Sequence, residues 1–227
     1  MSFVENINND ITYMTSPNIK AIHAFGTRSG SVRAALDIDP NNIVCLKQIH
    51  SADILVATAN DRSKILQPSP EGDGLITNEP NVALVVFSAD CVPILLHDPI
   101  KNVIGAVHAG WRGTATDIVG KAVQKMASHF DCSPSDIKAA IGPCISKCCY
   151  ETDADVANAI SSHEAVSAKK FMVDLKEANR LLLVNSGVSD IFISDECTSC
   201  NCDKYWSHRK TKGKRGTQAA VIMLMVR

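Results

Sequence analysis

The sequence predicts an α+β fold in which strands build the sheets and a few helices are segregated from them. Strand-like runs outnumber helical segments, and the two kinds do not alternate regularly along the chain. This order argues against a doubly wound parallel sheet. Several runs are apolar at every position, as expected for a sheet that is covered on both faces.

The strands are predicted from short runs with a high density of Val and Ile. We expect them at 21–26, 43–47, 53–57, 82–87, 92–97, 102–108, 137–142, 190–194 and 219–226.

The clearest helix is predicted from about Thr114 to Phe130. Its apolar residues recur at helical spacing and form one stripe. The stripe consists of Ile118, Val119, Ala122, Val123 and Met126. Two further helices are expected over 153–161 and 176–186, and Gly187 is a suitable C-terminal cap for the second.

Turn signals complete the expected organisation. Ser133 followed by Pro134 is typical of an N-cap and first helical position. The segment 57–74 is rich in turn-forming residues and predicts a loop. Without a repeat or low-complexity linker, we expect one domain over residues 1–227.

Composition argues against nucleic acid and membranes as partners. The formal net charge is −1, so no long-range field attracts polyanions. No apolar run approaches the roughly 20 residues that cross a bilayer. The basic stretch between Arg209 and Arg215 is interpreted as a solvated loop, with a phosphate-facing loop as the alternative.

The start of the chain and its cysteines indicate a cytoplasmic protein. Residues 1–10 have neither the basic flank nor the apolar core of a secretory signal. The nine cysteines are an odd number, and without export they are expected to stay reduced.

Three polar motifs each follow an apolar, strand-like run. They are Lys47-Gln48-Ile49-His50, Ser88-Ala89-Asp90-Cys91 and His108-Ala109-Gly110-Trp111-Arg112-Gly113. A buried strand that ends in His or Cys delivers a donor to a fixed point at a sheet edge. If they converge, His50, Cys91 and His108 make a three-ligand site with an open fourth position, which is typical of catalytic zinc.

Each ligand also has a purely structural interpretation. A single His is often a core residue bonded to a carbonyl, and a buried free Cys often packs as a small hydrophobe. Asp90 is expected to orient a ligand imidazole, because a buried acid needs a partner. Asp73, between two glycines, is either a turn aspartate or a substrate-facing acid. The guanidinium of Arg112 suits phosphate or carboxylate.

Two cysteine-rich segments partly match known zinc motifs. Cys144 and the cysteines after it resemble half of the zinc deaminase signature, but their spacing is one residue too long and the chain has no His-x-Glu. Cys197, Cys200 and Cys202 form a cluster whose first two members have chelating spacing. Closing a structural site there would need a fourth ligand such as His208.

Together these motifs resemble the YfiH/YlmD-like laccase-domain family, also called the polyphenol oxidase or purine nucleoside phosphorylase family. The resemblance covers nearly the full length, and its most specific parts are the His108–Gly113 run and Gly142-Pro143-Cys144. Other matching segments are Phe25-Gly26-Thr27-Arg28, Lys47-Gln48-Ile49-His50, Gly72-Asp73-Gly74-Leu75-Ile76-Thr77, Ala89-Asp90-Cys91-Val92-Pro93, Cys149-Tyr150-Glu151, Asp195-Glu196-Cys197-Thr198 and Ser207-His208-Arg209. His208 departs from the family's usual Tyr or Phe, and Cys200 and Cys202 match no family signature.

The resemblance implies a four-layer α/β/β/α sandwich with mixed sheets. It implies a metal, usually zinc and less often copper, held by His50, Cys91 and His108. It further implies phosphorolysis of adenosine, inosine, guanosine and methylthioadenosine, together with deamination of adenosine. The substrates would be purine nucleosides and phosphate.

Roles for individual residues follow from that implied chemistry. In deamination, zinc lowers the pKa of bound water to about 7, and Asp90 or Asp73 moves the proton. In phosphorolysis, Arg28, Arg112 and Arg209 are candidates to bind phosphate.

Three other functions stay open at this stage. A copper-dependent polyphenol oxidase uses similar donors, but a multicopper enzyme needs more than this chain's seven histidines. A hydrolase would use Cys91 and His108 as a nucleophilic dyad. The third alternative is a non-catalytic binding protein.

Overall fold

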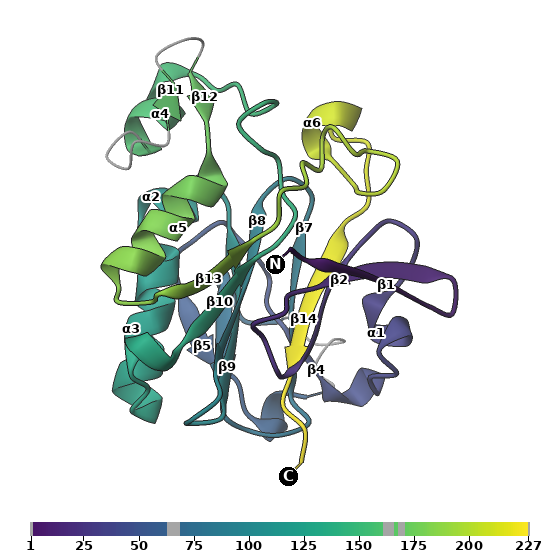
Figure 1. Cartoon of the computed structure of the whole chain (residues 1–227), viewed down its shortest axis with the longest axis vertical. Coiled ribbons are helices and arrows are strands. Elements are labelled where there is room, and N and C mark those ends of the chain that lie inside the picture. The colour runs from purple at the N-terminus through teal and green to yellow at the C-terminus, as the bar shows by residue number, and fades with distance from the viewer. Residues whose placement is uncertain (1, 63–68, 161–165, 168–170, 227) are drawn as a thin grey trace.

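The protein, described here as a computed structural model, is a sandwich of two mixed sheets with helices on both outer sides (Figure 1). The structure describes residues 2–62, 69–160, 166–167 and 171–226. The layers confirm the predicted α/β/β/α architecture. The outer helical layers differ in size: α2, α3 and α5 cover one sheet, whereas the short helix α1 lies against the other.

Within the described residues, the first sheet has six strands in the order β1-β2-β3-β14-β7-β4. Neighbouring strands are antiparallel, except that β4 runs parallel to β7. The bounds are β1 Val4–Asn8, β2 Ile11–Thr15, β3 Ile22–Gly26, β14 Gln218–Met223, β7 Ala83–Ser88 and β4 Ile43–Cys45. Strand β14 therefore lies between strands from the first half of the chain.

The second sheet, counted over the same described ranges, also has six strands, in the order β13-β10-β8-β9-β6-β5. Its two outer pairs are parallel and its inner pairs antiparallel. The bounds are β13 Asp190–Ile193, β10 Lys138–Ile141, β8 Val92–Asp98, β9 Val103–Ala109, β6 Gly74–Thr77 and β5 Ile54–Val56.

The helices are short, apart from two that lie on the second sheet. Their bounds are α1 Val32–Ala35, α2 Trp111–Ala115, α3 Ile118–Phe130, α4 Ala154–Ile160, α5 Leu175–Asn185 and α6 His208–Thr211. A small antiparallel pair, β11 Val166–Ser167 and β12 Met172–Val173, lies next to α4. Over the described residues, none of these helices combines the length and apolarity needed to cross a membrane.

Strand β8 shows why the central strands are apolar along most of their length. Ile94 and Leu96 face the core shared with the helices, whereas Leu95 faces the core between the two sheets. All three side chains are fully buried. Because successive side chains of a strand point to opposite faces, a strand in this layer must be apolar on both.

The structure corrects several predicted elements. The helix predicted from Thr114 is divided into α2 and α3, because Asp117 adopts a left-handed φ of 56° and its side chain caps α3 through the Gly120 N–H. The Ser133–Pro134 signal leads only to a 3-10 turn, Pro134–Asp136. The predicted C-terminal strand ends at Met223 rather than 226.

The hairpin of β1 and β2 was not among the predicted strands. Its residues are mostly exposed or half-buried and carry several Asn and Thr. An edge hairpin of this kind has little of the apolar density on which strand prediction depends. The predicted loop 57–74 falls partly outside the described residues. Its described part includes a 3-10 turn, Ala59–Asp61, and ends at β6.

Candidate metal centre

The structure brings His50, Cys91 and His108 together. Each contributes one ligand atom, and these atoms lie within 4.8 Å of one another. The two imidazole rings meet edge to face, with centroids 5.0 Å apart. Three segments converge here: the turn after β4, the bend between β7 and β8, and the end of β9. The spacing is compatible with one cation bound by all three residues.

The three ligands differ in exposure. His108 is buried at 4% exposure, Cys91 is half-buried and His50 is exposed. The side of the site formed by His50 therefore faces solvent and leaves access for a further ligand. A closed structural site would instead surround the ion with four protein ligands.

Asp73 organises the buried side of this site. Its Oδ1 lies 2.8 Å from Nδ1 of His108, which leaves Nε2 of that ring for a metal. The same carboxylate accepts hydrogen bonds from the backbone N–H groups of Ile49, His50 and Ser51 at 2.7–3.1 Å. Asp73 thus fixes both the imidazole of His108 and the turn that carries His50.

These contacts shift the protonation of the metal-free site. Burial alone would raise the pKa of Asp73, but the hydrogen bonds from His108 and the turn lower that pKa to about 2. Burial also raises the pKa of the Cys91 thiol, yet the two imidazoles bring it down to about 6. Asp73 and Cys91 in turn overcome burial at His108 and raise its pKa to about 9. Thiolate, the form that binds metals, is therefore favoured at neutral pH.

The backbone at this centre is strained at two non-glycine residues. His50 has a φ of 62° and Asp90 a φ of 93°. Such conformations cost roughly 1–3 kcal/mol and are concentrated at functional sites. The backbone of Gly110 also passes close to the ligands. A Cβ at this position would be 2.9 Å from Cδ2 of His50 and 3.2 Å from Sγ of Cys91.

Asp90 does not play the role that the sequence analysis gave it, because Asp73 is the acid beside the imidazole. The carboxylate of Asp90 accepts hydrogen bonds from the Thr198 hydroxyl at 2.6 Å and from the Arg209 backbone N–H at 2.7 Å. It therefore connects the neighbour of Cys91 to the C-terminal loops. The sequence had no local signal for a partner more than 100 residues away.

The three candidate arginines have different surroundings. Arg112, within the His108–Gly113 motif, is exposed on α2, and its guanidinium stacks on Trp111. The guanidinium of Arg209 donates to the carbonyls of Cys149 and Glu151, so two of its donors are already engaged. Arg28 donates to the Cys202 carbonyl and stacks on Trp206.

A second group of potential ligands is formed by Cys148, Cys149, Cys197 and Cys200. This composition corrects the expected Cys197–Cys200–Cys202 cluster. Among the described residues, neither Cys202 nor His208 belongs to the group, and Nδ1 of His208 accepts from Arg215 instead. The adjacent pair Cys148 and Cys149 takes their place.

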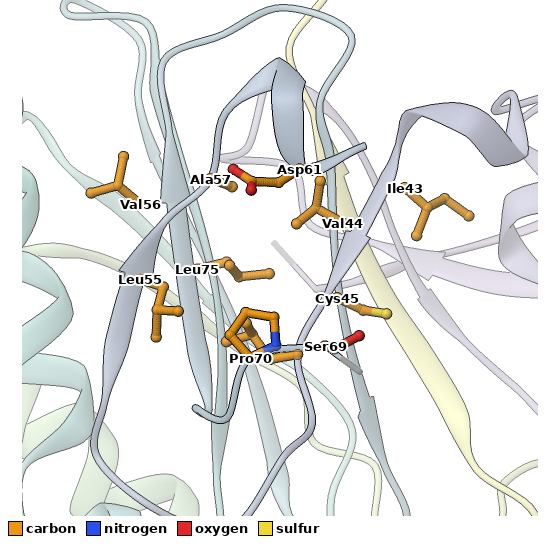
Figure 2. Close-up of a pocket in the computed structure, with 11 residues that line it drawn as sticks. Ile43, Val44, Cys45, Leu55, Val56, Ala57, Asp61, Ser69, Pro70 and Leu75 are labelled. Carbon is orange, nitrogen blue, oxygen red and sulfur yellow. The ribbon is translucent and has the colours of Figure 1, made fainter. Parts of the chain in front are cut away.

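A separate apolar pocket opens between β4 and β5 (Figure 2). Its described lining is mostly aliphatic, with Cys45, Asp61 and Ser69 as the exceptions, and contains none of the three candidate ligands. It includes Val44, Leu46, Leu55, Val56, Pro70 and Leu75. The pocket therefore does not form part of the metal centre.

The donor set fits the metal that the family resemblance implies. Two imidazoles and one thiolate are ligands for zinc and for copper, and three protein ligands with open access are typical of catalytic rather than structural sites. The hydrogen bond from His108 to Asp73 is the outer-sphere contact that metal-binding histidines almost always make.

The fold and the site define a two-sheet sandwich protein with a candidate transition-metal centre at one edge. The chain belongs to the multi-copper polyphenol oxidoreductase laccase family, whose model matches residues 24–225.

Curated relatives and a solved structure agree with this assignment. The chain is 40% identical over 194 residues to purine nucleoside phosphorylase YlmD of Geobacillus stearothermophilus, covering 79% of this chain and 71% of that protein. It is 36% identical over 236 residues to a purine nucleoside phosphorylase of Deinococcus radiodurans, covering 93% and 92%. The crystal structure of YfiH from Bacillus licheniformis superimposes with a TM-score of 0.91 at 29% identity, over 97% of this chain and 98% of that one.

Proposed function

We propose that this protein is a zinc-dependent purine nucleoside phosphorylase that also deaminates adenosine. The observation that carries the proposal is the convergence of His50, Cys91 and His108 within 4.8 Å, with Asp73 behind His108. The names of the relatives supply the reaction class. The proposed substrates are adenosine, inosine, guanosine and methylthioadenosine, with phosphate as co-substrate.

Two balanced reactions are proposed. In phosphorolysis, the bond between C1′ and the base nitrogen breaks, a bond from C1′ to a phosphate oxygen forms, and the base leaves with a proton. In deamination, water replaces the amino group of adenosine, and ammonia leaves. Zinc held by the three ligands would supply Lewis acidity and lower the pKa of water to about 7.

The protein's own residues have separate tasks in this proposal. The carboxylate of Asp73 accepts hydrogen bonds from four donors and stays ionised. It therefore positions His108 rather than carrying protons. Asp90, next to Cys91, is the acid assigned to proton movement. Arg112 has an exposed guanidinium fork and is assigned to phosphate, assisted by Arg209 and Arg28.

The test is to incubate the zinc-loaded protein with adenosine in the presence and absence of phosphate. Ribose 1-phosphate should appear only with phosphate, and inosine should appear in both reactions. His108→Ala should abolish both products, whereas His129→Ala, an exposed histidine on α3, should leave them unchanged. Full turnover by His108→Ala would refute the proposal.

A Cys–His hydrolase is the second candidate, and the mutual stabilisation of Cys91 thiolate and His108 imidazolium favours it. Reagents separate the two functions. A chelator should inactivate the zinc enzyme and spare a dyad, whereas iodoacetamide should inactivate a dyad in metal-free protein.

A copper-dependent polyphenol oxidase is the third candidate, because the matched family model is named for that activity. The described centre has the two His and one Cys of a blue-copper ligand set. Intense blue absorption together with phenol oxidation after copper loading would favour this function over phosphorolysis.

A further inference from the structure

We propose that this chain binds a second metal ion, a structural zinc, through the four thiolates of Cys148, Cys149, Cys197 and Cys200. The site is distinct from the His50–Cys91–His108 centre, and the proposal does not depend on the enzymatic activity. Four cysteine ligands close the coordination sphere of zinc, so this ion would stabilise structure rather than bind substrate.

The positions of the sulfur atoms carry the proposal. The Sγ of Cys200 lies 3.6 Å from that of Cys148 and 3.4 Å from that of Cys149, and the latter two are 3.7 Å apart. Including Cys197, all four sulfurs lie within 4.8 Å of one another. Sulfurs bound tetrahedrally at about 2.3 Å from zinc are themselves roughly 3.8 Å apart. The cluster therefore has nearly the spacing that a zinc ion requires.

The same distances do not single out a disulfide. Cys148, Cys149 and Cys200 are almost equidistant, so no pair is preferred over the other two. A disulfide joins two sulfurs and leaves the others as unpaired thiols, whereas one thiophilic cation binds all four. A tetrahedral set of four sulfur ligands is typical of zinc or iron.

The backbone around Cys197 is arranged to stabilise a thiolate. The N–H of Ser146 donates to Sγ of Cys197 at 3.3 Å. Cys197 and Cys200 also have the Cys-x-x-Cys spacing that is common among zinc ligands.

The position of the cluster indicates what the ion would do. It joins two loops about 50 residues apart in sequence, which already pair through Cys144 and Cys197. One loop carries Thr198, the hydrogen-bond partner of Asp90. The other carries the carbonyls that hold Arg209. A metal cross-link would therefore fix the two loops that contact Asp90 and Arg209. Cys148 and Cys200 are exposed, so the ion has a route of entry.

The experiment uses the full chain, prepared under reducing conditions, and counts bound zinc. Wild type should hold two equivalents. The triple variant His50→Ala/Cys91→Ser/His108→Ala should keep one, and Cys148→Ser/Cys200→Ser should also keep one. Cys202→Ser is the matched control, because Cys202 lies in the same loop outside the cluster, and it should keep both.

Cobalt identifies the ligands of each ion. The triple variant loaded with Co²⁺ should show the intense sulfur-to-cobalt charge-transfer bands of a four-thiolate site. The double cysteine variant should show only the weaker absorption of a site with the single thiolate of Cys91. Absence of metal from a folded triple variant whose cysteines are reduced would overturn the proposal. So would recovery of these cysteines as disulfides that only reductant, and not a chelator, converts to free thiols.

A measurement on wild type keeps the proposal testable if a variant does not fold. X-ray absorption at the zinc edge reports the average number of sulfur ligands per ion. If both sites are occupied, Cys91 supplies one sulfur to the first ion and the cluster supplies four to the second, so the average is well above one sulfur per ion. If only the first centre is occupied, the average is one sulfur per ion. A value of one sulfur per zinc would contradict the second site.

Discussion

The carboxylate of Asp73 lies 2.8 Å from Nδ1 of His108 and also binds the backbone on either side of His50. Two candidate ligands from different segments therefore depend on one fully buried acid. An acid in this position orients the ring and makes its other nitrogen more basic, and both effects favour metal binding.

Asp73→Asn should lower zinc affinity by about 10- to 100-fold. The amide has no negative charge. Its NH₂ group is a donor and cannot accept the hydrogen bonds that the backbone N–H groups now donate to the carboxylate. Competition with a chromophoric chelator measures the change. Asp53→Asn, at an exposed position near the same turn, should leave the affinity unchanged. Equal affinity of wild type and Asp73→Asn would show that this contact does not support the site.

Gly110→Ala should displace the ligands while leaving the fold in place. The added Cβ would be 2.9 Å from the His50 ring and 3.2 Å from the Cys91 sulfur, so at least one ligand must move. We expect loss of most zinc from the first centre, measured as bound metal. Gly105→Ala, in strand β9 just before Gly110, meets its nearest neighbour at 3.3 Å and serves as the control. It should retain zinc, and equal retention by Gly110→Ala would contradict the described geometry.

Asp90→Asn should lower kcat for the proposed reactions by about 100- to 10,000-fold if Asp90 moves a proton. Thr198→Val tests the alternative that Asp90 only holds its loop. It removes the 2.6 Å hydrogen bond but keeps the carboxylate. We expect a much smaller fall in kcat for Thr198→Val, with a decrease in melting temperature. Equal losses of kcat in the two variants would instead assign Asp90 a positioning role.

Arg112→Ala should raise KM for phosphate about tenfold or more while changing KM for the nucleoside little, because a guanidinium binds two phosphate oxygens at once. Arg112→Lys keeps the charge but loses the fork, so it should restore only part of the affinity. Arg180→Ala, at an ion pair with Glu177 on α5, is the control and should keep both constants. An unchanged KM for phosphate in Arg112→Ala would remove Arg112 from the phosphate site.

The stability of the protein should decrease between pH 7 and pH 5 because of His97. Burial lowers the pKa of His97 to about 4, from an ordinary value of 6.5. Between these values the unfolded chain binds a proton that the folded chain does not. The contribution of His97 to the free energy of unfolding is therefore fully present above about pH 6.5 and is lost progressively toward pH 4. At pH 5 the free energy of unfolding should be lower by roughly 1–2 kcal/mol.

Urea unfolding at both pH values measures this loss. His97→Gln should reduce the pH dependence, and part should remain because burial also lowers the pKa of His23. An identical pH dependence in wild type and His97→Gln would contradict the assignment.

The sequence by itself determined the sheet-rich fold and the three candidate ligands. Apolar runs on both faces identify central strands such as β8, and polar residues that end such runs identify His50, Cys91 and His108. These signals are local, since strand periodicity and the ends of apolar runs are encoded in neighbouring residues. The weakly apolar hairpin of β1 and β2 lacked such a signal and was missed.

Only the tertiary structure decided which distant residues are partners. It placed Asp73 rather than Asp90 beside His108, and it completed Cys197 and Cys200 with Cys148 and Cys149 rather than Cys202 and His208. These pairings depend on strand order and register, as where β6 lies against β9 and the Cys144 segment against Cys197. Spacing along the chain carries no information about register between distant segments, because packing of the whole sandwich sets it.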